Sequence, residues 1–82
     1  MDKNSLKLNI LRECYYHPNM YVGKESFRLF TDNEPLLTEC CSELVGAGYL
    51  LCKDCGYLIT EYGIEVFESY NNGQQLFWLF EG

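Results

Sequence analysis

The sequence predicts one small α+β domain that is mostly helical, and three observations support this fold class. Apolar residues recur at the spacing of amphipathic helices in several segments. Two short runs rich in apolar and aromatic residues flank a polar turn, which is typical of a β-hairpin. The 82 residues are 48% hydrophobic and 16% aromatic, a composition that excludes a disordered chain. We expect residues 1–82 to form a single domain, because this length leaves no room for a second core.

The first helix is predicted over residues 5–17 from a broad apolar stripe. Ser5 or Asn4 is placed to cap its start. Pro18 is placed to end it, because the residue before a proline avoids the helical region.

Residues 18–23 are expected to be a short extended connector. It leads to a second, short helix over residues 24–30, which buries Phe27 and either Phe30 or Leu29.

A third helix is predicted over residues 34–45. Asp32 or Asn33 supplies its N-cap, and Pro35 suits the first turn, where a missing N–H costs nothing. Its inward face is expected to hold Leu37, Cys41 (or Cys40), Leu44 and Ala47.

A β-hairpin is predicted from residues 49–52 and 57–60, with Gly56 at positive φ in the loop. Thr60 is then expected to cap a fourth helix that ends before residues 71–73. Three residues of this helix are expected to face inward: Ile64, Phe67 and Tyr70.

The end of the chain is strongly apolar, with Leu76, Phe77, Trp78, Leu79 and Phe80 in succession. We expect residues 71–82 to pack back on a core formed by about residues 5–70, or to lie in a homodimer contact. Aromatic residues are enriched at the cores of protein interfaces, which favours such a contact.

The formal net charge is −6, and it is unevenly distributed. Residues 1–28 carry a net +2, whereas residues 29–82 carry a net −8. A nucleic-acid-binding domain usually presents a basic face, so this balance argues against that class.

The order helix, short helix, helix, hairpin, helix resembles that of the winged helix-turn-helix superfamily. Two passages strengthen the resemblance: LVGAGYL at residues 44–50 is similar to the exit from a recognition helix, and LITEYG at residues 58–63 to the exit from a wing. The resemblance covers roughly residues 5–70. It implies that the third helix and the hairpin wing form the binding surface, because DNA-binding members place that helix in the major groove.

The expected outward face of the third helix departs from a DNA-reading pattern. It carries no Lys or Arg, and it shows Thr38, Glu39, Ser42 and Glu43. Protein–DNA affinity depends on several cationic phosphate contacts, which this helix does not offer.

The leading hypothesis is therefore an acidic winged-helix module that acts by protein–protein recognition of a partner with a basic surface. By class analogy, a phage or mobile-element inhibitor of the anti-CRISPR type, or a regulatory adaptor, has this size and acidity. The expected partner-binding residues are Glu39, Glu43, Asp54, Phe77, Trp78 and Phe80. The alternative is a DNA-binding transcriptional regulator that acts as a dimer through Lys24, Arg28, Thr38, Ser42 and Lys53.

Five cysteines in one short chain predict reduced thiols, because the count is odd and no secretory signal precedes them. Cys14 and one of Cys40 and Cys41 are expected to fill the core, with the two hairpin thiols partly exposed. Cys52 and Cys55 have the CxxC spacing of a zinc ligand pair. We predict no metal site, because a second pair is absent, and zinc at Cys52 and Cys55 remains the weaker alternative.

No constellation of catalytic residues or phosphate-binding glycine loop is present in the sequence. We therefore expect a protein that is not an enzyme and that has neither a cofactor nor a small-molecule substrate. No apolar run is long enough to span a bilayer, and the polar start lacks a signal peptide, so a cytoplasmic protein without membrane association is expected.

Overall fold

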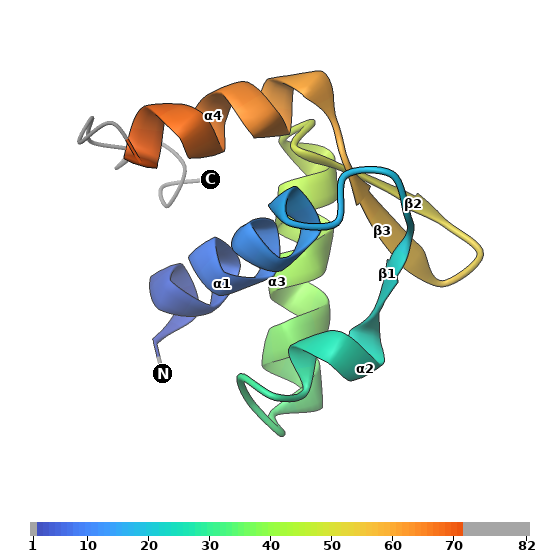
Figure 1. Ribbon diagram of the computed structural model, residues 1–82. Helices are drawn as coiled ribbons and strands as arrows, with labels where there is room; N and C mark the ends of the chain where they lie inside the picture. Colours follow the sequence, from blue (N-terminus) through green and yellow to red (C-terminus); the bar gives the residue numbers. More distant parts are fainter. Residues whose placement is uncertain (1, 72–82) are drawn as a thin grey trace.

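The computed structural model describes residues 2–71, which fold as an α+β domain (Figure 1). Within these residues the chain forms four helices and one three-stranded antiparallel sheet. The elements follow in the order α1 (Lys3–Tyr15), β1 (Val22–Gly23), α2 (Lys24–Phe27), α3 (Glu34–Gly46), β2 (Leu50–Lys53), β3 (Gly56–Ile59) and α4 (Glu61–Asn71).

Helix α1 begins two residues earlier than the apolar stripe indicates. Its N-cap is Asp2, whose carboxylate accepts the backbone N–H of Ser5 at 2.8 Å. The prediction of Ser5 or Asn4 as the cap was wrong, because a carboxylate at position 2 satisfies the orphan N–H groups one turn sooner. The helix ends at Tyr15, before Pro18 is reached.

Helix α2 is a single turn, Lys24–Phe27, and is shorter than the predicted residues 24–30. Phe27 is fully buried and Phe30 is half-buried, whereas Leu29 is exposed. Helix α3 begins at Glu34, as predicted, because the Asn33 side chain accepts the Leu36 N–H at 3.2 Å.

The predicted connector contains a strand. Val22 and Gly23 pair with Tyr57 and Gly56, so that the sheet has the order β1-β3-β2. No period-2 pattern marks this strand, because two residues are too few to alternate. The added strand ties the loop before α2 to the hairpin (Figure 1).

The hairpin turn differs from the prediction. The two-residue loop is Asp54–Cys55, and both residues lie in the left-handed region, with φ of 50° and 66°. Gly56 lies in the strand, and it is glycine for another reason: a Cβ there would stand 2.7 Å from the Cβ of Tyr21. Glycine is therefore required at position 56 by the close approach of the chain before β1, and not by a positive φ in the loop.

Helix α4 begins after Thr60, as predicted. The Thr60 hydroxyl accepts the Gly63 N–H at 2.9 Å and donates to the Gly48 carbonyl at 2.6 Å. Phe67 is buried and Ile64 is half-buried against the core, but Tyr70 is 37% exposed. The buried arc of the helix runs instead through Gly63, Val66 and Phe67.

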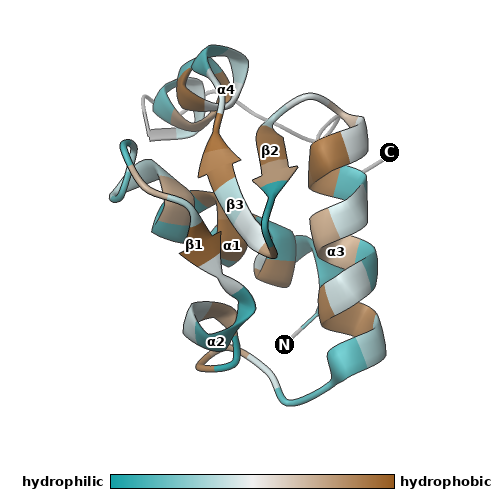
Figure 2. Cartoon of the chain, turned by 90° about the vertical axis from the view of Figure 1, so that its right-hand side faces the viewer, coloured by the Kyte–Doolittle hydropathy of each residue, from teal (hydrophilic) through white to brown (hydrophobic). Residues whose placement is uncertain are grey.

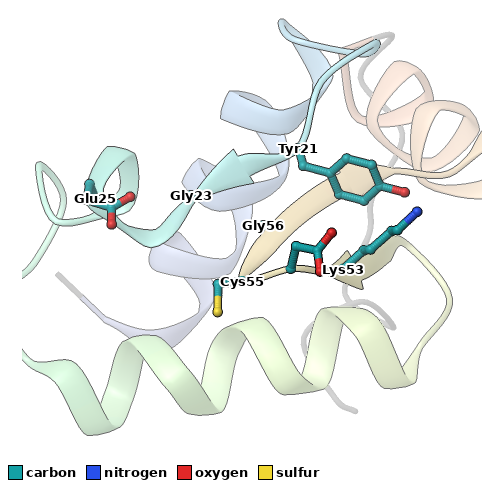
Figure 3. Close-up of a pocket in the computed structure, with 7 residues that line it drawn as sticks. Tyr21, Gly23, Glu25, Lys53, Cys55 and Gly56 are labelled. Carbon is teal, nitrogen blue, oxygen red and sulfur yellow. The ribbon is translucent and has the colours of Figure 1, made fainter.

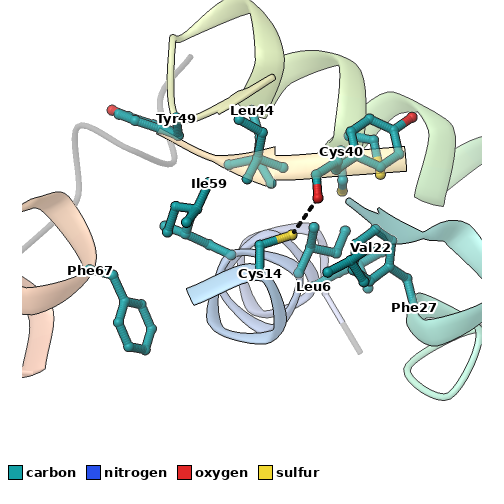
Figure 4. Close-up of a cluster of buried hydrophobic side chains, with 14 of the residues drawn as sticks. Leu6, Cys14, Val22, Phe27, Cys40, Leu44, Tyr49, Ile59 and Phe67 are labelled. Atoms are coloured by element: carbon teal, nitrogen blue, oxygen red, sulfur yellow. Dashed lines mark hydrogen bonds between the residues drawn. The ribbon is translucent and has the colours of Figure 1, made fainter. Parts of the chain in front are cut away.

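The core lies between α1, α3, α4 and the inner face of the sheet (Figures 2 and 4). Both Cys40 and Cys41 are buried, whereas only one of the two was predicted to fill the core. Ala47, predicted inward, is exposed because it is the C-cap residue of α3. The predicted packing of residues 76–80 lies outside the described residues.

Candidate interaction surfaces

A groove runs between α3 and the inner face of the hairpin. At one end it is lined by Ser42, Val45 and Gly46 of α3, and at the other by Lys24 and Arg28, whose side chains enter from the α2 segment. From the hairpin, Cys52 and Tyr57 line both ends, and Cys55 lines the end with Lys24 and Arg28. Four of the five residues assigned to DNA binding therefore lie at or beside this groove. Three of them line it, namely Lys24, Arg28 and Ser42, and the fourth, Thr38, contacts Lys24.

The cations at the groove have polar partners on α3. The Lys24 ammonium donates to the Thr38 hydroxyl at 3.1 Å. The Arg28 guanidinium donates to the Glu34 carboxylate at 2.6 Å. Glu25 also lines the groove, so the two cations there are equal in number to two carboxylates, those of Glu25 and Glu34.

Lys53, the fifth of those residues, lies on the other side of the hairpin. It borders a second concavity together with Tyr21, Asp54 and Gly56 (Figure 3). Residues alternate faces along a strand, so Lys53 and the inward Cys52 point in opposite directions.

An ion-pair network joins α1 to α3. The Lys3 ammonium lies 2.5 Å from one Glu43 oxygen and 3.5 Å from Glu39, and the Lys7 ammonium lies 2.8 Å from the other Glu43 oxygen. The hydrogen bonds from Lys3 and then Lys7 lower the pKa of Glu43 below its ordinary value. Glu43 therefore contacts α1, and its predicted place on the outward face was wrong.

This network contains a residue that the sequence analysis missed. Lys7 is only 2% exposed, which is a rare burial for lysine. A signal was present in the sequence: Lys3 and Lys7 are four residues apart, and so are Glu39 and Glu43. Two such pairs of opposite charge match when their helices pack side by side.

Helix α4 carries a second acidic set. Glu61, Glu65 and Glu68 are all exposed, and none of them forms an ion pair with another described residue. Glu68 accepts a hydrogen bond from the Tyr15 hydroxyl at 3.0 Å. Tyr62 adds an aromatic side chain that is 48% exposed. We call this surface, Glu61, Tyr62, Glu65 and Glu68, the acidic face of α4.

The residues predicted to bind a protein partner are not brought together. Glu39 and Glu43 lie against α1, whereas Asp54 is at the tip of the hairpin. Phe77, Trp78 and Phe80 lie outside the described residues.

The five thiols fall into two groups. Cys14, Cys40 and Cys41 are fully buried, and burial raises the pKa of Cys14 to about 12 and that of Cys41 to about 11. The Cys14 thiol lies 3.8 Å from the Tyr57 carbonyl (Figure 4). Cys52 and Cys55 are exposed. Within residues 2–71 no three potential ligands are gathered closely enough to hold a metal ion.

No protein-family model, curated protein or solved structure matches this chain. None of the helices within residues 2–71 combines the length and the apolar character needed to cross a bilayer.

Proposed function

We propose that this protein is a winged-helix-like module that acts by binding a protein partner with a basic surface. The observation that carries the proposal is the distribution of uncompensated charge. Around α3, the three glutamates are matched by Lys3, Lys7 and Arg28, whereas the acidic face of α4 has no cation partner among the described residues.

Among the glutamates of α4, Glu65 has no evident role in folding, whereas Glu68 accepts a hydrogen bond from Tyr15 of α1. Glu61 suits the first turn, where the helix dipole favours a carboxylate. Glu65 and Glu68 lie further along, and like charges four or three residues apart destabilise a helix by about 0.2–0.5 kcal/mol per pair. A basic partner would remove that repulsion and would contact Tyr62 between the charges.

The winged-helix assignment rests on the element order and on strand pairing. The third helix precedes an antiparallel hairpin, and a short strand between the first two helices completes the sheet. This arrangement is compatible with a winged helix, and it supports placing the groove between α3 and the hairpin at the position of a recognition surface.

The experiment compares two charge reversals that change the net charge equally. Glu65→Lys alters the acidic face of α4, while Asp32→Lys alters the opposite end of the molecule (Figures 1 and 2). A partner is captured from cell extract, purified and titrated against each folded variant. We expect the first variant to bind at least about tenfold more weakly, and the second to bind normally. Equal effects of both variants would refute the proposed surface.

The alternative is DNA binding, and one observation favours it: Lys24, Arg28, Thr38 and Ser42 gather at one groove. Anisotropy titration of a short random duplex at low salt separates the two functions. Protein recognition predicts no binding there. Binding that weakens steeply with added salt would restore the DNA-binding function, because each phosphate contact releases counterions.

A further inference from the structure

The hairpin carries two exposed thiols that lie outside the core. Cys52 is on the inner face of β2, and Cys55 is the second residue of the turn. Both are exposed, and both line the same end of the groove, beside Lys24 and Arg28. Figure 3 shows the Cys55 thiol on the side of the hairpin that faces α3.

The position of Cys55 is costly for a cysteine. At φ of 66° it lies in the left-handed region, which a side chain with a Cβ enters at a cost of about 1–2 kcal/mol. Asp-Gly is the preferred sequence for a two-residue hairpin turn with both residues at positive φ. Folding alone therefore favours glycine at this position, and the thiol needs another explanation.

The spacing of the pair fits a metal, but one chain is not enough. Cysteines at CxxC spacing bind zinc as half of a tetrahedral site, which needs four ligands. Glu25 lines the same concavity, but among the described residues no three potential ligands are grouped closely enough to hold an ion. The other three thiols are enclosed in the core.

We propose that Cys52 and Cys55 bind zinc together with the same two residues of a second copy of this chain, so that one ion joins two wings. On binding, the four thiols release their protons to solvent and coordinate Zn²⁺ as thiolates. The resulting centre carries a net charge of −2. Lys24 of each copy lines the concavity that holds the thiols and donates to the neutral Thr38 hydroxyl, so its ammonium is placed to offset part of that charge.

The geometry of the hairpin permits this contact. Asp54 and Cys55 form the tip of the wing, so two copies can approach tip to tip without disturbing either core. A site that joins the turn to the adjoining end of β2 also explains why these two thiols are exposed while the other three are not. This inference does not rest on the proposed protein partner.

The test titrates zinc chloride into reduced, metal-free full-length protein and follows the mass by native mass spectrometry and light scattering. We expect one zinc per two chains, a doubled mass, and return to the monomer with chelator. Cobalt in place of zinc should give the visible absorption of a tetrahedral thiolate site. Cys52→Ser and Cys55→Ser should each abolish the doubled mass. Asp54→Asn, which changes the same turn but removes no thiol, should retain it.

Four results would overturn the proposal: no zinc bound at equimolar concentration, one zinc per monomeric chain, zinc binding that persists when both wing cysteines are serine, or a doubled mass that survives the chelator. Because both cysteines are exposed, the serine variants should keep the circular dichroism spectrum of the parent. This control separates loss of zinc from loss of fold.

Discussion

The hairpin turn permits a sharp test of backbone energetics, through Cys55→Gly. The left-handed conformation costs a residue with a Cβ about 1–2 kcal/mol, and glycine avoids this cost. Glycine also makes the unfolded chain more flexible, which lowers the free energy of unfolding by about 0.5–1 kcal/mol. The net expectation is a gain of about 0.5–1 kcal/mol in the free energy of unfolding. For a domain of this size, that gain raises Tm by about 2–8 °C.

The assay is thermal unfolding followed by circular dichroism, in reducing buffer with chelator so that no metal contributes. Cys55→Ala is the matched control, because it removes the thiol but keeps the Cβ. The difference between the glycine and alanine variants reports the backbone conformation alone. If Cys55→Gly is no more stable than Cys55→Ala, the left-handed conformation of this residue is refuted.

Three further outcomes are expected. Gly63→Ala should lower the free energy of unfolding in urea by about 1–3 kcal/mol, because the added Cβ would overlap the Tyr49 carbonyl. Gly46→Ala should raise it by up to about 0.5 kcal/mol, because no atom lies near the added Cβ. The pKa of Glu43 is lowered in the folded state by its hydrogen bonds from two lysines, so its stabilisation is complete above the ordinary value of 4.5 and is lost as the pH falls through the lowered pKa. Unfolding of Glu43→Gln should therefore depend less on pH in that range, and an equal dependence would contradict the network. Ellman's reagent should label two thiols rapidly in the native protein and the remaining three only on unfolding, because burial raises the pKa of the core thiols.

Much of the fold could be predicted because its signals are local. Asn33 and Thr60 are caps that act within one turn, and the apolar spacing fixed the inward residues of α3 at Leu37 and Leu44. The misses depend on distant neighbours. Strand β1 exists only because β3 lies beside it, and Gly56 is required only because Tyr21 approaches it. Neither condition is visible in a single segment of sequence.

The candidate site was harder to predict for a related reason. A helical wheel distinguishes buried from exposed positions, but it does not say which neighbour covers an intermediate position. Glu43 is such a position, and α1 covers it with Lys3 and Lys7. The exposed face of α4 was not among the predicted site residues, because the resemblance to a winged helix implies a binding surface on the third helix and the hairpin. Its three carboxylates were nevertheless present in the sequence at helical spacing.

The acidity of this chain therefore has two physical origins that must be separated. The glutamates of α3 have partners within the molecule: Glu43 meets the ammonium of the buried Lys7, and Glu34 meets Arg28 in an exposed pair. A buried ammonium without a carboxylate is costly, so selection for folding alone is sufficient to keep Glu43. No such requirement holds for Glu65, which has no cation partner among residues 2–71. Negative charge on α3 is thus weak support for a basic partner, and the charge on α4 is the stronger support.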